Sequence, residues 1–164
     1  MDNREERRKL GEELEIHFRN WLDKNNIPYW YIQQDISTFS PALKDRFLGK
    51  RPDFMILLPN FGLLLVDLKN RKINQKYGTY PIDCSDAKKY SSIQRIFNLQ
   101  VWFVISNSEL NYETWMWIPV SKILEEGVIK QTSSKSGEEF FAVPTGNFTQ
   151  VANDDSLERL FSKL

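Results

Sequence analysis

The stretch RPDFMILLPNFGLLLVDLKN, residues 51–70, contains two apolar runs, 54–58 and 63–66, joined by a short connection. Neither run alternates with polar residues, so we predict two strands that are covered on both faces, as in the middle of a helix-flanked sheet. Three charged residues bound these runs: Asp53, Asp67 and Lys69. The core is expected to continue at these positions, so the charges point to a function.

Strand geometry tests whether the three charges can meet. Side chains alternate between faces along a strand, so Asp67 and Lys69 share a face. Asp53 joins them across an antiparallel pair only if the connection has an odd number of residues, because positions 53 and 67 then stand opposite each other. A connection of residues 59–61 or 58–62 satisfies this parity. A four-residue connection would require a bulge to correct the register.

Two carboxylates and an ammonium at a sheet end suit a hard divalent cation. Magnesium prefers a few carboxylate oxygens, keeps several waters and leaves positions open for a phosphate. Without metal, Asp53 and Asp67 would repel each other and one would hold its proton more tightly, so the cluster would be costly as structure alone. Lys69 could orient or deprotonate a water, or contact the charge that develops on the phosphate. The chemistry indicated is phosphodiester hydrolysis.

At these residues the sequence resembles the PD-(D/E)xK nuclease superfamily. Pro52-Asp53 matches PD, and Asp67-Leu68-Lys69 matches (D/E)xK with Asp in its first position. The resemblance implies a divalent-metal-dependent endonuclease that hydrolyses DNA. It also implies that Mg²⁺ or Mn²⁺ is held by Asp53, Asp67 and the backbone carbonyl of Leu68, with Lys69 as a catalytic residue.

The family's core also has a preceding helix that carries a Glu, and residues 11–29, GEELEIHFRNWLDKNNIPY, can supply it. Here the chain resembles archaeal-type Holliday junction resolvases, in which Gly, three residues and Glu precede apolar positions three, six and seven further on. The matching residues are Glu15, Phe18, Trp21 and Leu22. The resemblance therefore implies Glu15 as a further catalytic and metal-holding acid. Glu12, one helical turn earlier on the same face, is its rival.

The resemblance implies a restriction-endonuclease-like α/β core, with a central mixed β-sheet flanked by helices in the order αβββαβ. We expect one domain over residues 1–164, with its core at about 10–120 and a C-terminal extension at 121–164. Periodicity, caps and turn residues predict these segments: helix 4–24, strand 29–36, loop 37–42, hairpin 53–68, helix 85–98 capped by Ser85, strand 101–106, edge strand 115–120, short helix 121–126, strand 139–143 and amphipathic helix 156–164.

Composition excludes several classes of protein. The chain has 164 residues, 41% of them hydrophobic, yet its longest apolar runs are far below the roughly 20 residues needed to span a bilayer. The opening MDNREERRKL is a charged helix start rather than a signal peptide, so we expect a cytoplasmic protein without a membrane segment. Cys84 and His17 are the only residues of their kinds, which excludes an intramolecular disulfide, a Cys-based zinc cage and His-dependent nuclease or protease mechanisms.

Charge is zero overall but unevenly distributed. Residues 43–95 carry 11 Lys and Arg against 5 Asp and Glu, a local balance of +6 around the proposed site. Such a stripe suits phosphate binding, although a charge run is usually only a solvated face. Seven side chains are predicted to contact nucleic acid: Lys50, Arg51, Arg71, Lys72, Lys88, Lys89 and Gln94.

Two points stay open at this stage. On the second helix, related nucleases use a Lys, Gln or Tyr against the phosphate or the ion. A buried stripe of Tyr90, Ile93 and Phe97 with its lysines in solvent fits that segment equally well. Most tryptophans should belong to the core rather than form stacking platforms for bases, with Trp115 and Trp117 the least certain.

Three functions remain. The first is the DNA endonuclease, which could act as a homodimer or in a larger protein complex. The second is a catalytically silent nucleic-acid binding subunit of a larger DNA-processing or mobile-element complex. The third is a structural or interaction domain in which the acids form ordinary ion pairs.

Overall fold

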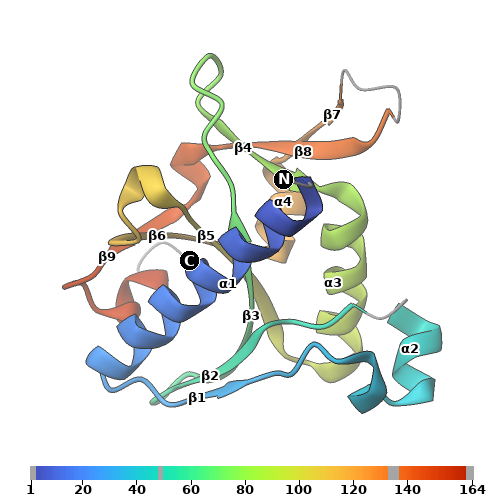
Figure 1. The fold of residues 1–164 in the computed structure, drawn as a ribbon, viewed down its shortest axis with the longest axis vertical. Helices are drawn as coiled ribbons and strands as arrows, with labels where there is room; N and C mark the ends of the chain where they lie inside the picture. Colours follow the sequence, from blue (N-terminus) through green and yellow to red (C-terminus); the bar gives the residue numbers. More distant parts are fainter. Residues whose placement is uncertain (1–2, 48–49, 133–136, 162–164) are drawn as a thin grey trace.

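The computed structural model describes residues 3–47, 50–132 and 137–161 (Figure 1). Its elements, in chain order, are α1 (Asn3–Lys24), β1 (Tyr29–Tyr31), η1 (Ile36–Thr38), α2 (Pro41–Phe47), β2 (Phe54–Leu58), β3 (Gly62–Asn70), β4 (Thr79–Asp83), α3 (Cys84–Phe97), β5 (Gln100–Ser106), η2 (Ser108–Leu110), β6 (Thr114–Pro119), α4 (Val120–Glu126), β7 (Val128–Gln131), β8 (Glu139–Pro144), η3 (Thr145–Asn147), β9 (Thr149–Ala152) and η4 (Leu157–Phe161).

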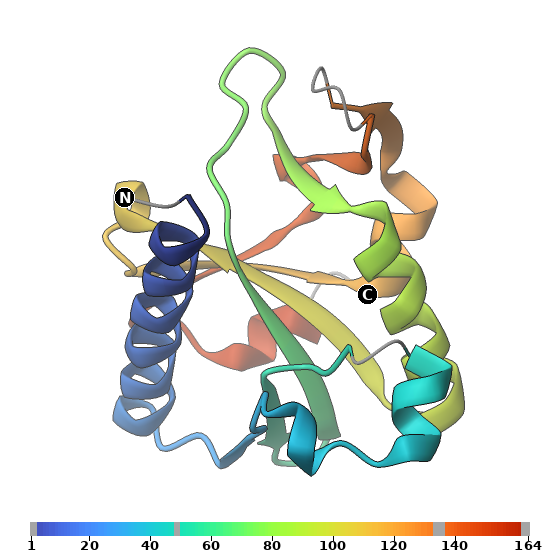
Figure 2. The ribbon, with the colours of Figure 1, turned by 45° about the vertical axis from the view of Figure 1, so that its right-hand side comes forward.

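A six-stranded sheet in the order β1-β2-β3-β5-β6-β9 forms the centre of the molecule. Only β3 and β5 are parallel, and the other neighbouring pairs are antiparallel. Helices α1 and α3 lie on opposite sides of this sheet (Figure 2). A second sheet in the order β4-β8-β7 packs beside α3 and α4. The fold is therefore a mixed α/β fold with a helix-flanked central sheet, as the sequence predicts.

The predicted order αβββαβ is confirmed as α1, β1, β2, β3, α3 and β5. Two elements are added to it. Helix α2 follows β1, and β4 precedes α3 and pairs with β8. Strands from the segment after residue 120 join both sheets. Strand β9 extends the central sheet beside β6, and β8 pairs with β4.

Several local predictions need correction. The first strand ends at Tyr31 rather than residue 36, and α2 begins inside the predicted loop 37–42. Helix α3 begins at Cys84 after Asp83, with no side-chain cap hydrogen bond, so the predicted Ser85 cap is wrong.

Two further predictions are wrong: the edge position of the strand at 115–120 and the helix at 156–164. Strand β6 is not at the edge, because Pro119 stands at its last position and β9 pairs along the side that remains free. The segment predicted as a helix at 156–164 is a short 3₁₀ turn at Leu157–Phe161, and residues 162–164 lie outside the described part of the chain.

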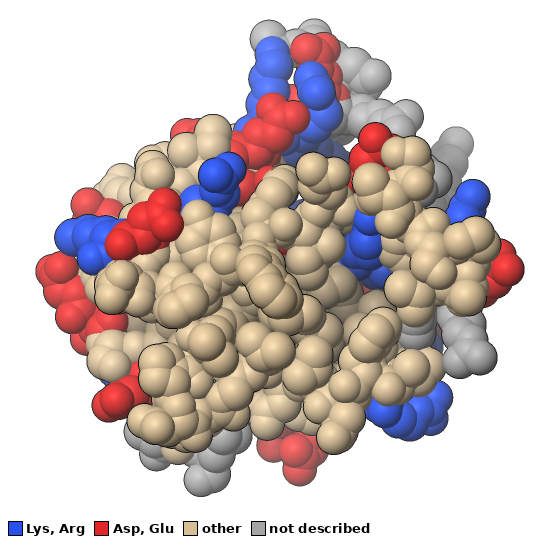
Figure 3. All heavy atoms as spheres, turned by 90° about the horizontal axis from the view of Figure 1, so that it is seen from below, with Lys and Arg blue, Asp and Glu red and all other residues tan. Residues whose placement is uncertain are grey.

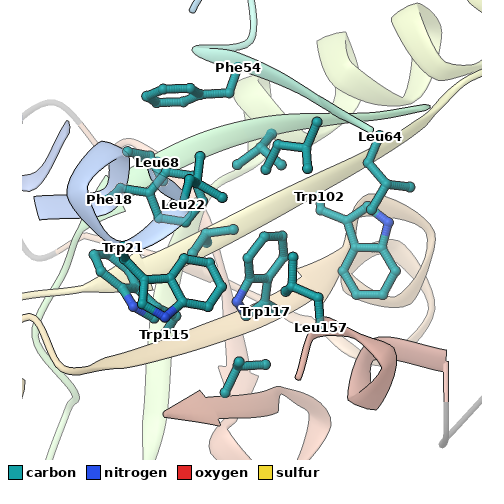
Figure 4. Packing of buried hydrophobic residues seen from close by; sticks show 14 of the residues in the cluster. Phe18, Trp21, Leu22, Phe54, Leu64, Leu68, Trp102, Trp115, Trp117 and Leu157 are labelled. Atoms are coloured by element: carbon teal, nitrogen blue, oxygen red, sulfur yellow. The ribbon is translucent and has the colours of Figure 1, made fainter. Parts of the chain in front are cut away.

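Aromatic side chains fix α1 against the central sheet (Figure 4). Phe18 on α1 is fully buried, and its ring lies 5.3 Å from Phe54, 5.0 Å from Trp115 and 5.9 Å from Trp117. The predicted core role is confirmed for four of the five tryptophans, including Trp115 and Trp117. Each of the four is at most 4% exposed, and Trp30 is the exception at 72%.

The end of the molecule that carries β1 and β2 presents a broad face with few charges (Figure 3). The residues around a shallow hollow there are apolar: Pro28, Tyr29, Trp30, Met55, Leu57 and Leu63. Among the described helices none is long and apolar enough to cross a membrane.

Candidate active site

The register of the β2–β3 hairpin brings the two predicted acids together. Phe54 pairs with Val66 and Leu58 with Gly62, which leaves the three-residue connection 59–61. Asn60 at φ 70° and Gly62 at φ 103° adopt the left-handed backbone that this turn requires. The parity prediction is therefore confirmed, and the next position of the register places Asp53 beside Asp67.

A hollow of about 280 Å³ lies at this end of β3. The residues that line it include most of the predicted site: Glu15, Lys50, Arg51, Asp53, Asp67, Leu68 and Lys69. They come from α1, from the segment before β2 and from β3. Gly11, Leu14, Gln34 and Asn70 complete the lining.

Asp67 is the most enclosed acid, with 3% of its surface exposed. Its Oδ2 lies 2.7 Å from Lys69 Nζ, and the Tyr90 hydroxyl from α3 donates a hydrogen bond to its Oδ1. Burial and the charge of Asp67 raise the pKa of Tyr90 well above its ordinary value, so this hydroxyl keeps its proton at neutral pH. Of the predicted buried stripe on α3, Tyr90 and Ile93 are buried, but Phe97 is 46% exposed, so the prediction is wrong for Phe97. Tyr90 also reaches the site, because its hydroxyl orients the Asp67 carboxylate.

Asp53 accepts a hydrogen bond from the backbone N–H of Leu68 at 2.7 Å. Burial and the nearby charge of Asp67 raise the pKa of Asp53 well above its ordinary value, against the opposing effects of that hydrogen bond and of Lys69. This is the direction that repulsion between two neighbouring carboxylates predicts. A cation placed between them would relieve it.

Lys69 lies between two carboxylates. Its Nζ is 2.7 Å from Asp67 Oδ2 and 2.9 Å from Asp86 Oδ2. Burial lowers the pKa of Lys69, but the charges of Asp67 and Asp86 outweigh burial and raise the pKa above its ordinary value. Lys69 is therefore a charged donor in this arrangement, suited to orienting a water or a phosphate oxygen rather than removing a proton.

Asp86 is a site residue that the sequence analysis missed. From the first turn of α3, its Oδ2 also lies 3.0 Å from Lys50 Nζ. Burial opposes its ionisation, yet Lys69 and Lys50 hold the pKa of Asp86 below its usual range. In the sequence, Asp86 is an acid in the first turn of a predicted helix. Acids are common there because they interact favourably with the helix dipole. Its contacts are with residues 17 and 36 positions away, which no local pattern reveals.

Glu15 and Glu12 differ in their position relative to the hollow. Glu15 lines the hollow and accepts a hydrogen bond from the Tyr31 hydroxyl at 2.7 Å. Burial and that bond raise the pKa of Tyr31 to about 12. Glu12 is absent from the lining, and its side chain, 57% exposed, lies 3.4 Å from Arg8. Of the two glutamates, Glu15 is therefore the one that lines the hollow.

The residues predicted to contact nucleic acid do not form one group. Lys50 and Arg51 line the hollow itself. Arg71 pairs with Asp83 at 3.1 Å and, like Lys88, lines an adjoining groove. The remaining three lie away from the lining: Lys72 pairs with Glu109 at 2.7 Å, Gln94 Oε1 accepts from the Val101 backbone N–H at 3.0 Å, and Lys89 lies on α3.

The donor set suits Mg²⁺ or Mn²⁺ bound through few protein ligands. Within residues 3–47, 50–132 and 137–161, no three His, Cys, Asp or Glu side chains cluster closely enough to form a metal cage. Magnesium, however, commonly uses one or two carboxylates and keeps waters. Asp67 Oδ2 is buried and accepts no hydrogen bond of normal geometry, its one close partner being the Lys69 ammonium. A cation that displaces this ammonium could bind the oxygen.

We expect Asp86→Asn to lower cleavage about 10- to 100-fold, the usual cost of losing a group that orients a site residue. The amide cannot pair with Lys69 and Lys50, so both ammoniums lose a fixed position. Steady-state cleavage assays would measure the effect. Asp83→Asn is the matched control, since Asp83 immediately precedes α3 but pairs with Arg71 outside the hollow. Equal activities of the two variants would contradict the role of Asp86.

Asp53→Asn should stabilise the metal-free protein. The folded-state pKa of Asp53 is raised. The folded protein therefore binds more protons than the unfolded chain between the two pKa values, and the free energy of unfolding falls as pH rises through that interval. Asn removes this penalty, so the melting temperature should increase by about 2–4 °C per kcal/mol gained and depend less on pH. Thermal melts from pH 4 to 8 without divalent metal would measure it. A lower melting temperature at every pH would contradict the prediction.

The fold is a PD-(D/E)xK nuclease-like, restriction-endonuclease-like fold. The 1.6 Å structure of Hjc, a Holliday junction resolvase from Archaeoglobus fulgidus, is similar, with a TM-score of 0.54 and 12% identity over 92% of this chain and 93% of that one. D212, a nuclease from a fusellovirus, gives a TM-score of 0.49 and 18% identity over 98% of this chain and 90% of that one. No protein-family model and no curated protein sequence matches the chain.

Proposed function

We propose that the protein is a divalent-metal-dependent endonuclease that hydrolyses DNA phosphodiester bonds. The observation that carries the proposal is the convergence of Glu15, Asp53, Asp67 and Lys69 in one hollow at the end of β3. An ordinary ion-pair network would not require a buried carboxylate, Asp67, beside a half-buried one, Asp53, whose pKa is raised well above normal. The similarity in fold to a Holliday junction resolvase supports the same class of reaction.

The residues that would hold Mg²⁺ or Mn²⁺ are Asp53, Asp67, the backbone carbonyl of Leu68 and Glu15. The ion would supply charge stabilisation at the phosphate and a water of lowered pKa. Tyr90 and the Leu68 N–H hold the carboxylates of Asp67 and Asp53 in place. Because Lys69 contacts the same Asp67 oxygen, an ion there would displace its ammonium, and Asp86 would keep that ammonium at the edge of the hollow.

Substrate orientation is assigned to the cations of the same hollow. Lys50 Nζ is held by Asp86, and the Arg51 guanidinium donates to the Asp35 carbonyl and to Thr38. These contacts fix Lys50 against α3 and Arg51 against the segment that contains η1. Phosphates bound there would be positioned without any reading of sequence.

The test is cleavage of labelled linear, supercoiled, branched and single-stranded DNA with and without Mg²⁺ or Mn²⁺. Metal-dependent cleavage is the expected result. A second readout does not depend on activity: Mg²⁺ at 100 times its dissociation constant should stabilise the wild type by about 2.7 kcal/mol in thermal melts, and should stabilise Asp53→Asn much less. Salt-dependent binding without cleavage would instead identify a silent nucleic-acid binding subunit. If the protein neither cleaves nor binds DNA, the remaining function is that of a structural or interaction domain.

We further propose that a second copy of the chain covers the charge-poor face formed by β1 and β2. Trp30 and Leu57 there are 72% and 43% exposed, and β1 is at an open edge of the central sheet. Exposed apolar patches beside free strand edges are typical of association sites, and the scarcity of charge disfavours DNA at this face.

Light scattering should therefore show a dimer of the wild type and a monomer of Trp30→Asp. Ile129→Asp, a similarly apolar and 52% exposed position on β7, is the matched control and should leave the dimer intact. A monomeric wild type at tens of micromolar would contradict this assignment.

A further inference from the structure

The connection between β3 and β4 forms a finger that projects beyond the body of the molecule, here defined as residues 70–79 (Figure 1). Its tip is a defined turn. Asn74 pairs with Thr79 as an isolated bridge, the Asn74 N–H donates to the Thr79 carbonyl at 2.8 Å, and the Gly78 N–H donates to the Asn74 carbonyl at 2.8 Å. Gly78 supplies the left-handed backbone of the turn at φ +59°. The finger is thus built to present its tip.

The tip presents an aromatic ring between two ammonium groups. Tyr77 is 55% exposed, and its ring centroid lies 5.1 Å from Lys76 Nζ and 4.5 Å from Lys130 Nζ. Lys130 comes from β7, so two parts of the fold meet here. An exposed ring among cations offers a stacking surface together with positive charge, the combination that binds single-stranded nucleic acid.

The charges at the tip differ from those at the base of the finger. At the base, Arg71 and Lys72 pair with Asp83 and Glu109. In the part of the chain that the structure describes, Lys76 and Lys130 pair with no carboxylate. Phosphate is the partner that these two ammoniums can take without breaking an ion pair.

The finger is continuous with the candidate active site. It leaves β3 directly after Lys69 and Asn70, which line the hollow, and Arg71 then lines the adjoining groove of about 550 Å³. The seven residue-to-residue steps from residue 70 to residue 77 span at most about 23 Å when the chain is extended. That is roughly the length of seven base pairs of duplex. One DNA molecule can therefore reach both places.

We propose that the finger binds unpaired nucleotides of the substrate. Tyr77 stacks on an unstacked base while Lys76 and Lys130 turn towards the neighbouring phosphates. This assignment rests on the proposed DNA endonuclease function and adds a substrate feature to it: an unpaired stretch within about seven base pairs of the bond that is cut. Fully paired duplex offers no base face to the ring.

The experiment compares binding of two fluorescein-labelled DNAs to variants made in the cleavage-inactive Asp67→Asn protein. One DNA is a full duplex, and the other carries an unpaired stretch with 2-aminopurine in it. Tyr77→Ala should weaken binding of the second DNA roughly 10-fold and leave the full duplex within 2-fold. Tyr77→Phe keeps the aromatic ring, so it should bind the second DNA like the parent protein and quench the 2-aminopurine fluorescence to the same extent.

The matched control is Phe61→Ala, because Phe61 is 54% exposed and precedes the opposite end of β3. It should bind both DNAs like its parent. Lys76→Ala and Lys130→Ala should each weaken the binding of both DNAs. Each should also reduce the salt dependence of binding by about one phosphate contact. If Tyr77→Ala weakens the binding of both DNAs equally, or of neither, the stacking role is overturned.

Failure of this inference differs from failure of the proposed function. Metal-dependent cleavage by the wild type, with Tyr77→Ala binding both DNAs like its parent, would overturn the finger alone. Tyr77-dependent binding by a protein that cleaves none of the DNAs would overturn the nuclease alone and support the finger.

Discussion

Asp67→Asn is expected to reduce metal-dependent cleavage by at least about 10³-fold, because loss of metal-based charge stabilisation costs several kcal/mol of activation free energy. Asp67 is the centre of the site. Its two carboxylate oxygens contact Tyr90 and Lys69, and it raises the pKa of Asp53. The amide keeps the shape and the contact with Tyr90 but carries no charge for a cation. Single-turnover cleavage with saturating enzyme would measure the loss.

The control for this variant makes the same chemical change on the surface. Asp154→Asn alters a side chain that is 95% exposed and pairs with Lys24 at 3.6 Å. It should cleave like the wild type. Both variants should retain the circular dichroism spectrum of the folded protein. Activity of Asp67→Asn within 10-fold of wild type would contradict the assignment of the site.

Phe18→Ala should lower the free energy of unfolding by about 3–5 kcal/mol, the range for truncating a buried Phe. Phe18 is fully buried where α1 meets Phe54, Trp115 and Trp117. These rigid rings cannot close around the missing one, so a cavity remains. Since domains are stable by only about 5–15 kcal/mol, the loss is a large part of the total. Urea unfolding followed by tryptophan fluorescence would measure it.

Ile16→Ala is the matched control on the same helix, since Ile16 is 56% exposed, and it should change stability by less than about 0.5 kcal/mol. Phe18→Ala should also weaken cleavage in proportion to the folded fraction, because α1 carries Glu15 to the hollow. A change below 1 kcal/mol in Phe18→Ala would show that α1 is not fixed by this cluster.

Local pattern predicted the parts of the site that lie close together in sequence. The hairpin parity located Asp53 beside Asp67, and alternation along β3 located Lys69 with them. The resemblance favoured Glu15, and helical spacing kept Glu12 as its rival, since both lie on one face. Only the packing of α1 against the sheet separated them, because it places Glu15 in the lining of the hollow and leaves the Glu12 side chain 57% exposed.

Pattern failed where a long-range partner decides the structure. Strand β6 was expected at an edge from Pro119 alone, but β9, distant in sequence, pairs along its free side. Helix α2 is short and lies within a stretch whose Ser and Pro residues also suit a loop, so propensity could not define it. Asp86 had a complete local explanation as a helix-start acid, and its lysine partners became visible only in three dimensions.

The sequence by itself determined the helix-flanked fold and the acid–acid–lysine group, because strand alternation and hairpin parity are local consequences of backbone geometry. The tertiary structure alone decided which glutamate faces the hollow, that Asp86 holds Lys69 and Lys50, and that Tyr77 meets Lys130 at the tip of the finger. These contacts join residues from different elements. Their positions depend on how whole helices and sheets pack, which no local periodicity encodes.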